Sequence, residues 1–264
     1  MDDILRFSLD DDNVARVTLN RPDRHNAFNA ELIAAMTTAF NDAAARSARA
    51  VVLAGEGRSF SAGADLDYMK AAGGWSRAEN EADGQRLSDM LASIAACPCP
   101  VIAVAHGSIF GGGVGLVACA DIAVAVEGAK FRLSEVRLGL TPATISPFVI
   151  AAIGARAARR WFTTAELFGA REALAMGLVH AVATDATAAA ALVDAWLTAI
   201  LEAAPGAVAD AKRLIADFAG QPITADLRAD SARRIAARRS DPEAAEGLAA
   251  FLEKRRPDWM SADA

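Results

Sequence analysis

Histidine and cysteine are both scarce in this sequence, with three residues of each among 264. So few histidines, widely separated along the chain, argue against a histidine-rich metal centre. The odd number of cysteines and the lack of a Cys-x-x-Cys pair argue against a disulfide framework and a zinc site. We therefore predict no metal, and three reduced thiols at Cys97, Cys99 and Cys119.

Long hydrophobic runs and excess positive charge are also missing. The opening residues, MDDILRFSLDDDN, contain no basic stretch followed by an apolar one, so no signal peptide is predicted. The most apolar segment, residues 100–126, is interrupted by His106, several glycines and Asp121, and falls short of a membrane span. The formal net charge of −6 disfavours a nucleic-acid partner. We expect a cytoplasmic protein with neither a membrane nor a nucleic-acid partner.

Apolar patterning predicts an α/β core. Hydrophobic residues make up 53% of the chain, enough for a large buried interior. Alternating or continuous apolar runs predict strands at residues 14–19, 50–54, 101–105, 122–126 and 177–182. Helices are predicted after Asn29 and at residues 85–96. The polar, glycine-containing residues 73–83 are expected to form a mobile surface segment.

The chain beyond Pro147 differs in composition from the part before it. Beyond Pro147 the residues are mostly Ala, Leu, Arg and Glu, which predicts helices broken at Pro205, at residues 220–222 and at Pro242. We divide the chain at Pro205 into an α/β core domain, residues 1–204, and a C-terminal α-helical oligomerisation region, residues 205–264.

Residues 111–115, Gly-Gly-Gly-Val-Gly, follow a predicted strand and open a predicted helix. Three consecutive glycines exceed what a turn needs, and they allow a ligand to approach unpaired N–H groups at a helix start. Residues 113–118 also match the G-x-G-x-x-G/A dinucleotide pattern. That reading, a nucleotide-dependent oxidoreductase, is disfavoured because the next strand ends near Glu127, too soon for a Rossmann crossover.

The second reading of the glycines is an oxyanion hole, in which two N–H donors from separate loops meet one oxygen. Its partner loop would be residues 61–65, Ser-Ala-Gly-Ala-Asp, whose small side chains permit close backbone approach.

Five segments, taken in order, resemble the enoyl-CoA hydratase/isomerase (crotonase) family: NRPDRHNA at 20–27, FSAGADL at 60–66, HGSIFGGGVGLVACAD at 106–121, FRLSEVRLG at 131–139 and FLEKRR at 251–256. The resemblance covers nearly the whole chain. It implies an α/β crotonase (ClpP/crotonase-like) fold, a spiral of β-turn-β repeats flanked by helices, with a helical C-terminal region. It also implies an acyl-CoA thioester substrate, no cofactor apart from the coenzyme A of that substrate, and a homotrimer or dimer of trimers.

Site residues follow from this resemblance position by position. The two oxyanion donors would be the backbone N–H groups of Ala64 and Gly112. The coenzyme A and substrate contacts would come from the same two residues and from Arg24, Ala62, Asp65, Leu66, Asp67, Phe251 and Lys254. For Arg24, an equally good interpretation is a solvent-exposed charge on a turn that contacts no ligand.

Hydratases of the family typically use two glutamates, and this chain has one of them. The first position holds Gly115, and the second holds Glu135, the only side chain we name as catalytic. The expected activity is addition of water to a 2-enoyl-CoA. Alternatives are a Δ3-Δ2-enoyl-CoA isomerase that uses a single Glu, and a non-catalytic acyl-CoA binder.

A finer resemblance concerns the acyl group. The segments around Gly115 and Glu135 look like bacterial methylglutaconyl-CoA hydratases of leucine breakdown, which also often carry glycine at the first glutamate position. This similarity implies 3-methylglutaconyl-CoA as a candidate substrate, with Arg137 as a partner for its carboxylate.

Overall fold

A computed structural model describes residues 4–260. Its centre is a six-stranded sheet in the order β1-β2-β3-β4-β6-β9, formed by Leu5–Leu9, Val14–Leu19, Ala50–Gly55, Val101–Ala105, Ile122–Val126 and Ala181–Ala183. Strands β1 and β2 are antiparallel, and all later neighbours are parallel. The strands predicted at 14–19, 50–54, 101–105 and 122–126 are confirmed, and the last one begins later than predicted.

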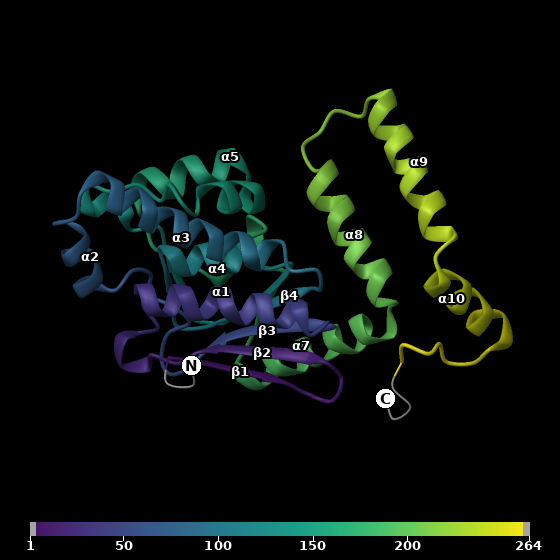
Figure 1. Cartoon of the computed structure of the whole chain (residues 1–264). Helices are drawn as coiled ribbons and strands as arrows, with labels where there is room; N and C mark the ends of the chain where they lie inside the picture. The colour runs from purple at the N-terminus through teal and green to yellow at the C-terminus, as the bar shows by residue number, and fades with distance from the viewer. Residues whose placement is uncertain (1–3, 261–264) are drawn as a thin grey trace.

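Both faces of this sheet are buried, which explains the nearly continuous apolar runs of its central strands. In β3, Val51 and Leu53 face the larger core, whereas Ala50 and Val52 face the smaller one. Figure 1 shows helices packed on one face and α7 (Ala186–Glu202) on the other. The helices of the first face are α1 (Ala30–Ala45), α3 (Arg77–Ala95), α4 (Gly112–Cys119) and α5 (Ser146–Thr164).

A second, three-stranded sheet lies next to the helix α4. Its order is β5-β7-β8, formed by Ser108–Phe110, Lys130–Arg132 and Phe168–Gly169. Single bridges join Ser61 to Ile109 and Phe28 to Ala64, so the small sheet is continued by the loops after β2 and β3. The remaining short elements are η1 (Pro22–Arg24), α2 (Leu66–Ala72), η2 (Glu135–Leu138) and α6 (Ala170–Ala175).

The segment predicted to be mobile, residues 73–83, is only partly a loop, and this prediction was wrong for its second half. Helix α3 begins at Arg77 because Ser76 and Glu79 form a capping box: the Ser76 hydroxyl accepts from the Glu79 N–H, and the Glu79 carboxylate accepts from the Ser76 N–H. The eight residues 77–84, all polar or small, therefore form the first turns of a helix that the apolar pattern predicted only from residue 85 onward.

Three helices form an arm at the C-terminal end: α8 (Pro205–Phe218), α9 (Ala225–Arg239) and α10 (Pro242–Glu253). Figure 1 shows this arm extending away from the sheet and its helices. Lys212 of α8 joins it to the core, since its Nζ donates to Asp121 Oδ2 at 2.6 Å and to the Cys99 carbonyl at 3.1 Å. The division into domains at Pro205 remains a prediction.

Within residues 4–260, no single helix is long and apolar enough to cross a membrane, although α7 and α8 together pass that test as a pair bent by 107°.

Candidate active site

Backbone pairing orients the loop that carries Ala64. The Phe28 N–H donates to the Gly63 carbonyl at 2.6 Å, and the Asp65 N–H donates to the Phe28 carbonyl at 2.8 Å. Because successive peptide groups of an extended chain point to opposite sides, the N–H of Ala64 points away from Phe28. Among the described residues that N–H has no protein acceptor.

The glycine loop supplies a second N–H without a protein partner in the described chain. Helix α4 begins at Gly112, so the N–H of this residue has no acceptor inside the helix. Gly111 turns the chain with a φ of 50°, and Gly112 leaves no room for a side chain, since a β-carbon would lie 2.5 Å from Cε2 of Phe28. A β-carbon on Gly63 would lie 3.5 Å from the Gly112 nitrogen, so the two loops are in contact.

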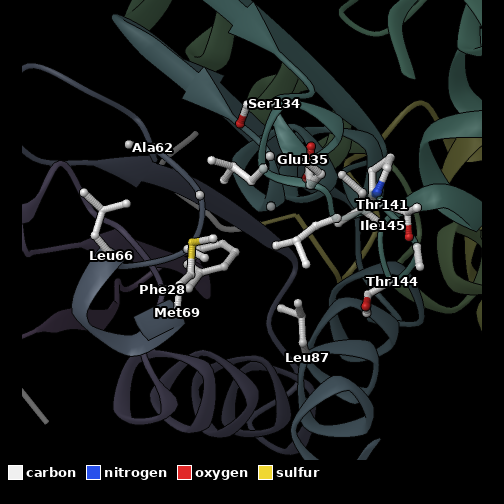
Figure 2. Close-up of a pocket in the computed structure, with 18 residues that line it drawn as sticks. Phe28, Ala62, Leu66, Met69, Leu87, Ser134, Glu135, Thr141, Thr144 and Ile145 are labelled. Carbon is white, nitrogen blue, oxygen red and sulfur yellow. The ribbon is translucent and has the colours of Figure 1, made fainter. Parts of the chain in front are cut away.

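A cavity of about 260 Å³ opens where these loops meet. Figure 2 shows Leu66 and Ala62 at one end, Thr144 and Ile145 at the other, and Glu135 between them. Leu66 is 77% exposed, whereas Ile145 is 3% exposed, so the cavity runs from the surface toward the interior. Apolar side chains and backbone dominate the lining, which consists of residues 62–64, 111, 112, 134, 135, 138 and 140–145 with Phe28, Leu66, Met69 and Leu87.

Glu135 begins the short helix η2 and is the single titratable side chain in the described lining. Its Oε1 lies 3.0 Å from the place of a β-carbon on Gly111, so the carboxyl sits beside the glycine loop. Burial raises the pKa of Glu135, and a hydrogen bond from its own backbone N–H offsets part of that rise. Its buried Oε2 has no hydrogen-bond partner among the described residues, which leaves one oxygen available to a ligand.

Hydrocarbon occupies the position at which the family resemblance implies a second glutamate. Gly115 is buried in α4. A β-carbon there would lie 2.4 Å from Cγ2 of Ile145, so Ile145 already fills that space. The cavity thus combines two backbone donors with one carboxyl group.

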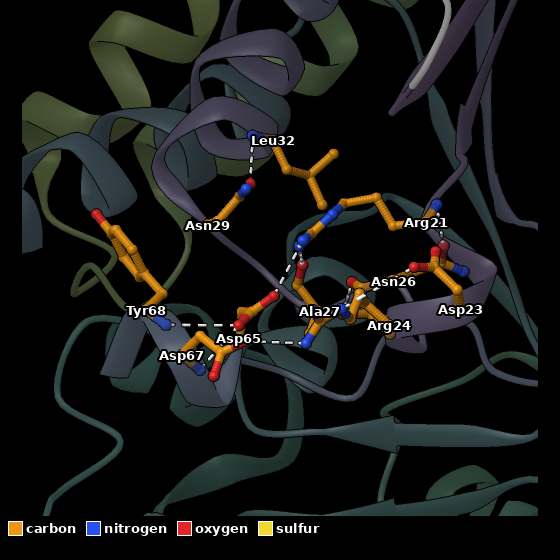
Figure 3. A network of polar contacts seen from close by, with 11 residues as sticks. Arg21, Asp23, Arg24, Asn26, Ala27, Asn29, Leu32, Asp65, Asp67 and Tyr68 are labelled. Atoms are coloured by element: carbon orange, nitrogen blue, oxygen red, sulfur yellow. Dashed lines mark hydrogen bonds and ion pairs between the residues drawn. The ribbon is translucent and has the colours of Figure 1, made fainter. Parts of the chain in front are cut away.

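Two Arg–Asp pairs hold the loop that contains Ala64, as Figure 3 shows. Arg21 Nη2 donates to Asp65 Oδ2 at 3.0 Å, and Asp65 also caps helix α2 by accepting from the N–H of Asp67 and of Tyr68. Arg24 Nη1 donates to Asp67 Oδ2, also at 3.0 Å. Asp65 is therefore turned inward, and neither it nor Asp67 belongs to the described cavity lining.

The predicted site residues divide into two groups. Ala62, Ala64, Leu66, Gly112 and Glu135 come together around the cavity. Arg24, Asp65 and Asp67 lie behind or beside it, and Arg137 is exposed on η2 outside the described lining. Phe251 and Lys254 lie at the end of α10, which Figure 1 places on the other side of the molecule from α2. Within one chain they do not reach the cavity, and their role remains a prediction.

Sequence reasoning missed much of the apolar lining. Phe28, Met69 and Leu87 read as ordinary core positions, and residues 139–145 lie in an irregular stretch between η2 and α5. A usable signal existed for Phe28, which directly follows the NRPDRHNA segment. Arg21, the partner of Asp65, lies in that same segment.

Comparison with known proteins assigns this arrangement to a family. A model of the enoyl-CoA hydratase/isomerase family matches residues 10–262. A Rhodobacter capsulatus protein described as a probable enoyl-CoA hydratase is 31% identical over 267 residues, covering 97% of each chain. An Alternaria alternata enoyl-CoA hydratase is 39% identical over 200 residues, which are 75% of this chain and 65% of that relative.

Solved structures agree over nearly the full length. An enoyl-CoA hydratase from Shewanella pealeana superposes with a TM-score of 0.93 at 37% identity, covering 97% of this chain and 96% of that one. AtuE from Pseudomonas aeruginosa gives a TM-score of 0.93 at 33% identity, with 98% and 100% covered. The crotonase fold expected from the sequence is confirmed. The chain is an enzyme of the enoyl-CoA hydratase/isomerase family.

Proposed function

We propose that this enzyme adds water across the C2–C3 double bond of a 2-enoyl-CoA thioester. The observation that carries the proposal is the position of Glu135 beside two loops whose N–H groups, on Ala64 and Gly112, lack protein acceptors in the described chain. A thioester oxygen placed at these donors would gain negative charge as an enolate forms. Donors fixed in advance stabilise such charge strongly, with one donor contributing about 3–4 kcal/mol in other enzymes.

The cavity orients the substrate in this proposal. The exposed end at Leu66 would receive the pantetheine arm, and the apolar end near Ile145 would receive the acyl tail. Arg24, Asp65 and Asp67 would border the path of coenzyme A, and Phe251 and Lys254 would reach it only from another subunit. Glu135 would then exchange a proton with C2 or with water. Coenzyme A enters as part of the substrate, and no further cofactor is proposed.

The test uses the absorbance of the conjugated enoyl thioester. Purified enzyme incubated with a panel of 2-enoyl-CoAs, with and without a terminal carboxylate, should remove this absorbance from at least one of them as water adds, and Glu135→Gln should remove it from none. Binding of crotonyl-CoA without turnover of any enoyl-CoA would instead identify a non-catalytic acyl-CoA binder.

One observation favours a second candidate, the Δ3-Δ2-enoyl-CoA isomerase reaction. Ile145 occupies the space beside Gly115, so Glu135 works without a second carboxylate from the described chain. One carboxylate suffices to move a proton between C2 and C4, which needs no water. Appearance of the conjugated absorbance from a 3-enoyl-CoA, with no loss from a 2-enoyl-CoA, would establish this alternative.

The acyl group inferred from the finer resemblance, 3-methylglutaconyl-CoA, remains a prediction, as does a place in leucine degradation. Its support is the similarity of the segments around Gly115 and Glu135. Arg137, the partner predicted for its carboxylate, does not line the cavity within residues 4–260. Activity across a small panel of enoyl-CoAs, with and without a terminal carboxylate, would identify the preferred acyl group.

We also propose that the C-terminal arm joins copies of the chain, as a homotrimer or a dimer of trimers. Leu248, Phe251 and Leu252 form an apolar stripe on α10 that is 61–79% exposed. A single chain gains nothing from this exposure, whereas a neighbouring copy would bury it. Light scattering should give a mass well above the 27.4 kDa of one chain. Leu248→Glu with Leu252→Glu should lower that mass.

A further inference from the structure

Hydration requires two proton transfers, but the described cavity lining contains one titratable side chain. Water must lose a proton as its oxygen bonds to C3, and C2 must gain one. Glu135 can serve one of these steps at a time. The other polar side chains of the lining, on Ser134, Thr141 and Thr144, are neutral hydroxyls.

The protein has no space for a second carboxylate on the cavity wall that Ile145 forms next to Gly115. A β-carbon on Gly115 would lie 2.4 Å from Cγ2 and 3.0 Å from Cβ of Ile145. Ile145 is buried and lines the cavity, so this wall presents hydrocarbon. Hydrocarbon neither holds a water molecule nor accepts its proton.

The cavity lining described within residues 4–260 also contains no Lys, Arg or His side chain. An anionic group on the acyl chain would therefore meet neutral donors, such as the hydroxyls of the exposed Thr141 and the half-buried Thr144 in the lining near Ile145 (Figure 2). Without an ion pair to lower its pKa, such a group would remain basic.

We propose that the substrate supplies the missing base: a carboxylate attached to C4 of the acyl chain takes the proton from the attacking water, while Glu135 protonates C2. This inference rests on the proposed hydration. The carboxylate oxygen, the proton and the water oxygen would close a six-membered ring with C3, C4 and C5. Such a ring forms for either configuration of the double bond, and it gives the base a high effective concentration.

The atoms and electrons balance in this sequence. The water oxygen bonds to C3, and the double-bond electrons move into an enolate whose oxygen faces the N–H groups of Ala64 and Gly112. The C5 carboxylate accepts the water proton. The enolate takes the Glu135 proton at C2 as the thioester carbonyl forms again. The resulting C5 carboxylic acid then returns its proton to Glu135, so that one water is consumed and no oxidant or reductant is needed.

The environment of Glu135 suits the acid half of this scheme. Burial favours its protonated form, and its Oε2 lacks a partner among the described residues. A second carboxylate entering the same cavity would favour protonation further, as in other carboxyl pairs that share one proton.

Three thioesters test the inference: 3-methylglutaconyl-CoA, its C5 primary amide, and 3-methylcrotonyl-CoA. The amide matches the acid in size but cannot accept the proton. Relative to the acid, we expect kcat for the amide to fall at least about a hundredfold, the usual effect of losing a general base. 3-Methylcrotonyl-CoA should be equally slow.

Binding separates catalysis from recognition. The saturated analogues 3-methylglutaryl-CoA and its C5 amide cannot be hydrated, so their dissociation constants report ground-state affinity alone. We expect these two constants to agree within about tenfold. Equal kcat for acid and amide would overturn the inference and leave the hydratase proposal standing, as would a defect confined to KM. If the enzyme hydrated none of the three thioesters and did not hydrate crotonyl-CoA either, both proposals would be overturned.

Discussion

Arg21 and Asp65 form a buried ion pair behind the loop that carries Ala64, with side chains 14% and 7% exposed. Burial alone would raise the pKa of Asp65. Hydrogen bonds from Arg21 and from the backbone N–H groups of Asp67 and Tyr68 outweigh burial and hold that pKa below its ordinary value. The carboxylate therefore stabilises the fold above the ordinary aspartate pKa, and this contribution is lost as pH falls through the lowered pKa.

Asp65→Asn keeps a side-chain oxygen for the cap of α2 but leaves Arg21 as an unpaired buried charge. We expect a loss of about 3–5 kcal/mol in the free energy of unfolding, measured with urea at pH 7. The pair Arg24–Asp67 provides a matched control, since its atoms are also 3.0 Å apart but its side chains are 53% and 79% exposed. Asp67→Asn should cost less than about 1 kcal/mol. Similar losses for the two variants would contradict this account.

Apart from Glu135 and Leu66, the parts of the site that sequence reasoning located are backbone features of small residues. Three glycines at 111–113 signal a close approach because the residue type itself removes a steric limit. The family resemblance then fixed Ala64, Gly112 and Glu135 in order along the chain. The structure brings the loops of these residues to one cavity.

Side-chain pairing could not be read in the same way. Arg21–Asp65 and Arg24–Asp67 involve identical residue types a few positions apart, yet one pair is buried and the other solvated. Asp65 directly follows the bridge between Phe28 and Ala64, a tertiary contact, whereas Asp67 lies in the exposed first turn of α2. The start of α3 was missed for a different reason: polar residues 77–83 carry no apolar periodicity, and only the Ser76 capping box marks them as helical.

Gly115 should tolerate no side chain while Ile145 is present. We expect Gly115→Ala to lower the free energy of unfolding by about 1–3 kcal/mol, because the added methyl overpacks against Ile145. Gly84 in α3 is the control, since nothing lies within 4 Å of a β-carbon there. Gly84→Ala should stabilise by about 0.5–1 kcal/mol through helix propensity. In the Ile145→Ala background the Gly115→Ala penalty should disappear, and its persistence would show that Ile145 is not the obstacle.

Lys212 should control how firmly the C-terminal arm is attached. Lys212→Met keeps the hydrocarbon length but removes the hydrogen bonds to Asp121 and to the Cys99 carbonyl. Asp121 retains its hydrogen bond from the Val101 N–H at 2.7 Å, so β4 should be unaffected. Hydrogen exchange is therefore expected to quicken in α8 and to stay unchanged in β4. Equal acceleration in both elements would indicate that Lys212 supports the whole core instead.

Glu135→Gln separates chemistry from binding and from stability. The variant should lose turnover by at least about a hundredfold, because a general acid or base is removed, while the affinity for a saturated acyl-CoA changes little. Unchanged turnover would remove Glu135 from the mechanism.

Stability gives an independent readout of the same carboxyl group. Its pKa is raised in the folded protein, so its contribution to stability is complete below the ordinary glutamate pKa and is lost as pH rises through the raised value. Each pKa unit corresponds to about 1.4 kcal/mol. Glutamine cannot ionise, and we therefore expect Glu135→Gln to be more stable than the wild type at pH 8, with a smaller difference at pH 4.5. Urea unfolding at the two pH values measures this, and a gain that is the same at both would mean that ionisation of Glu135 is not its cause.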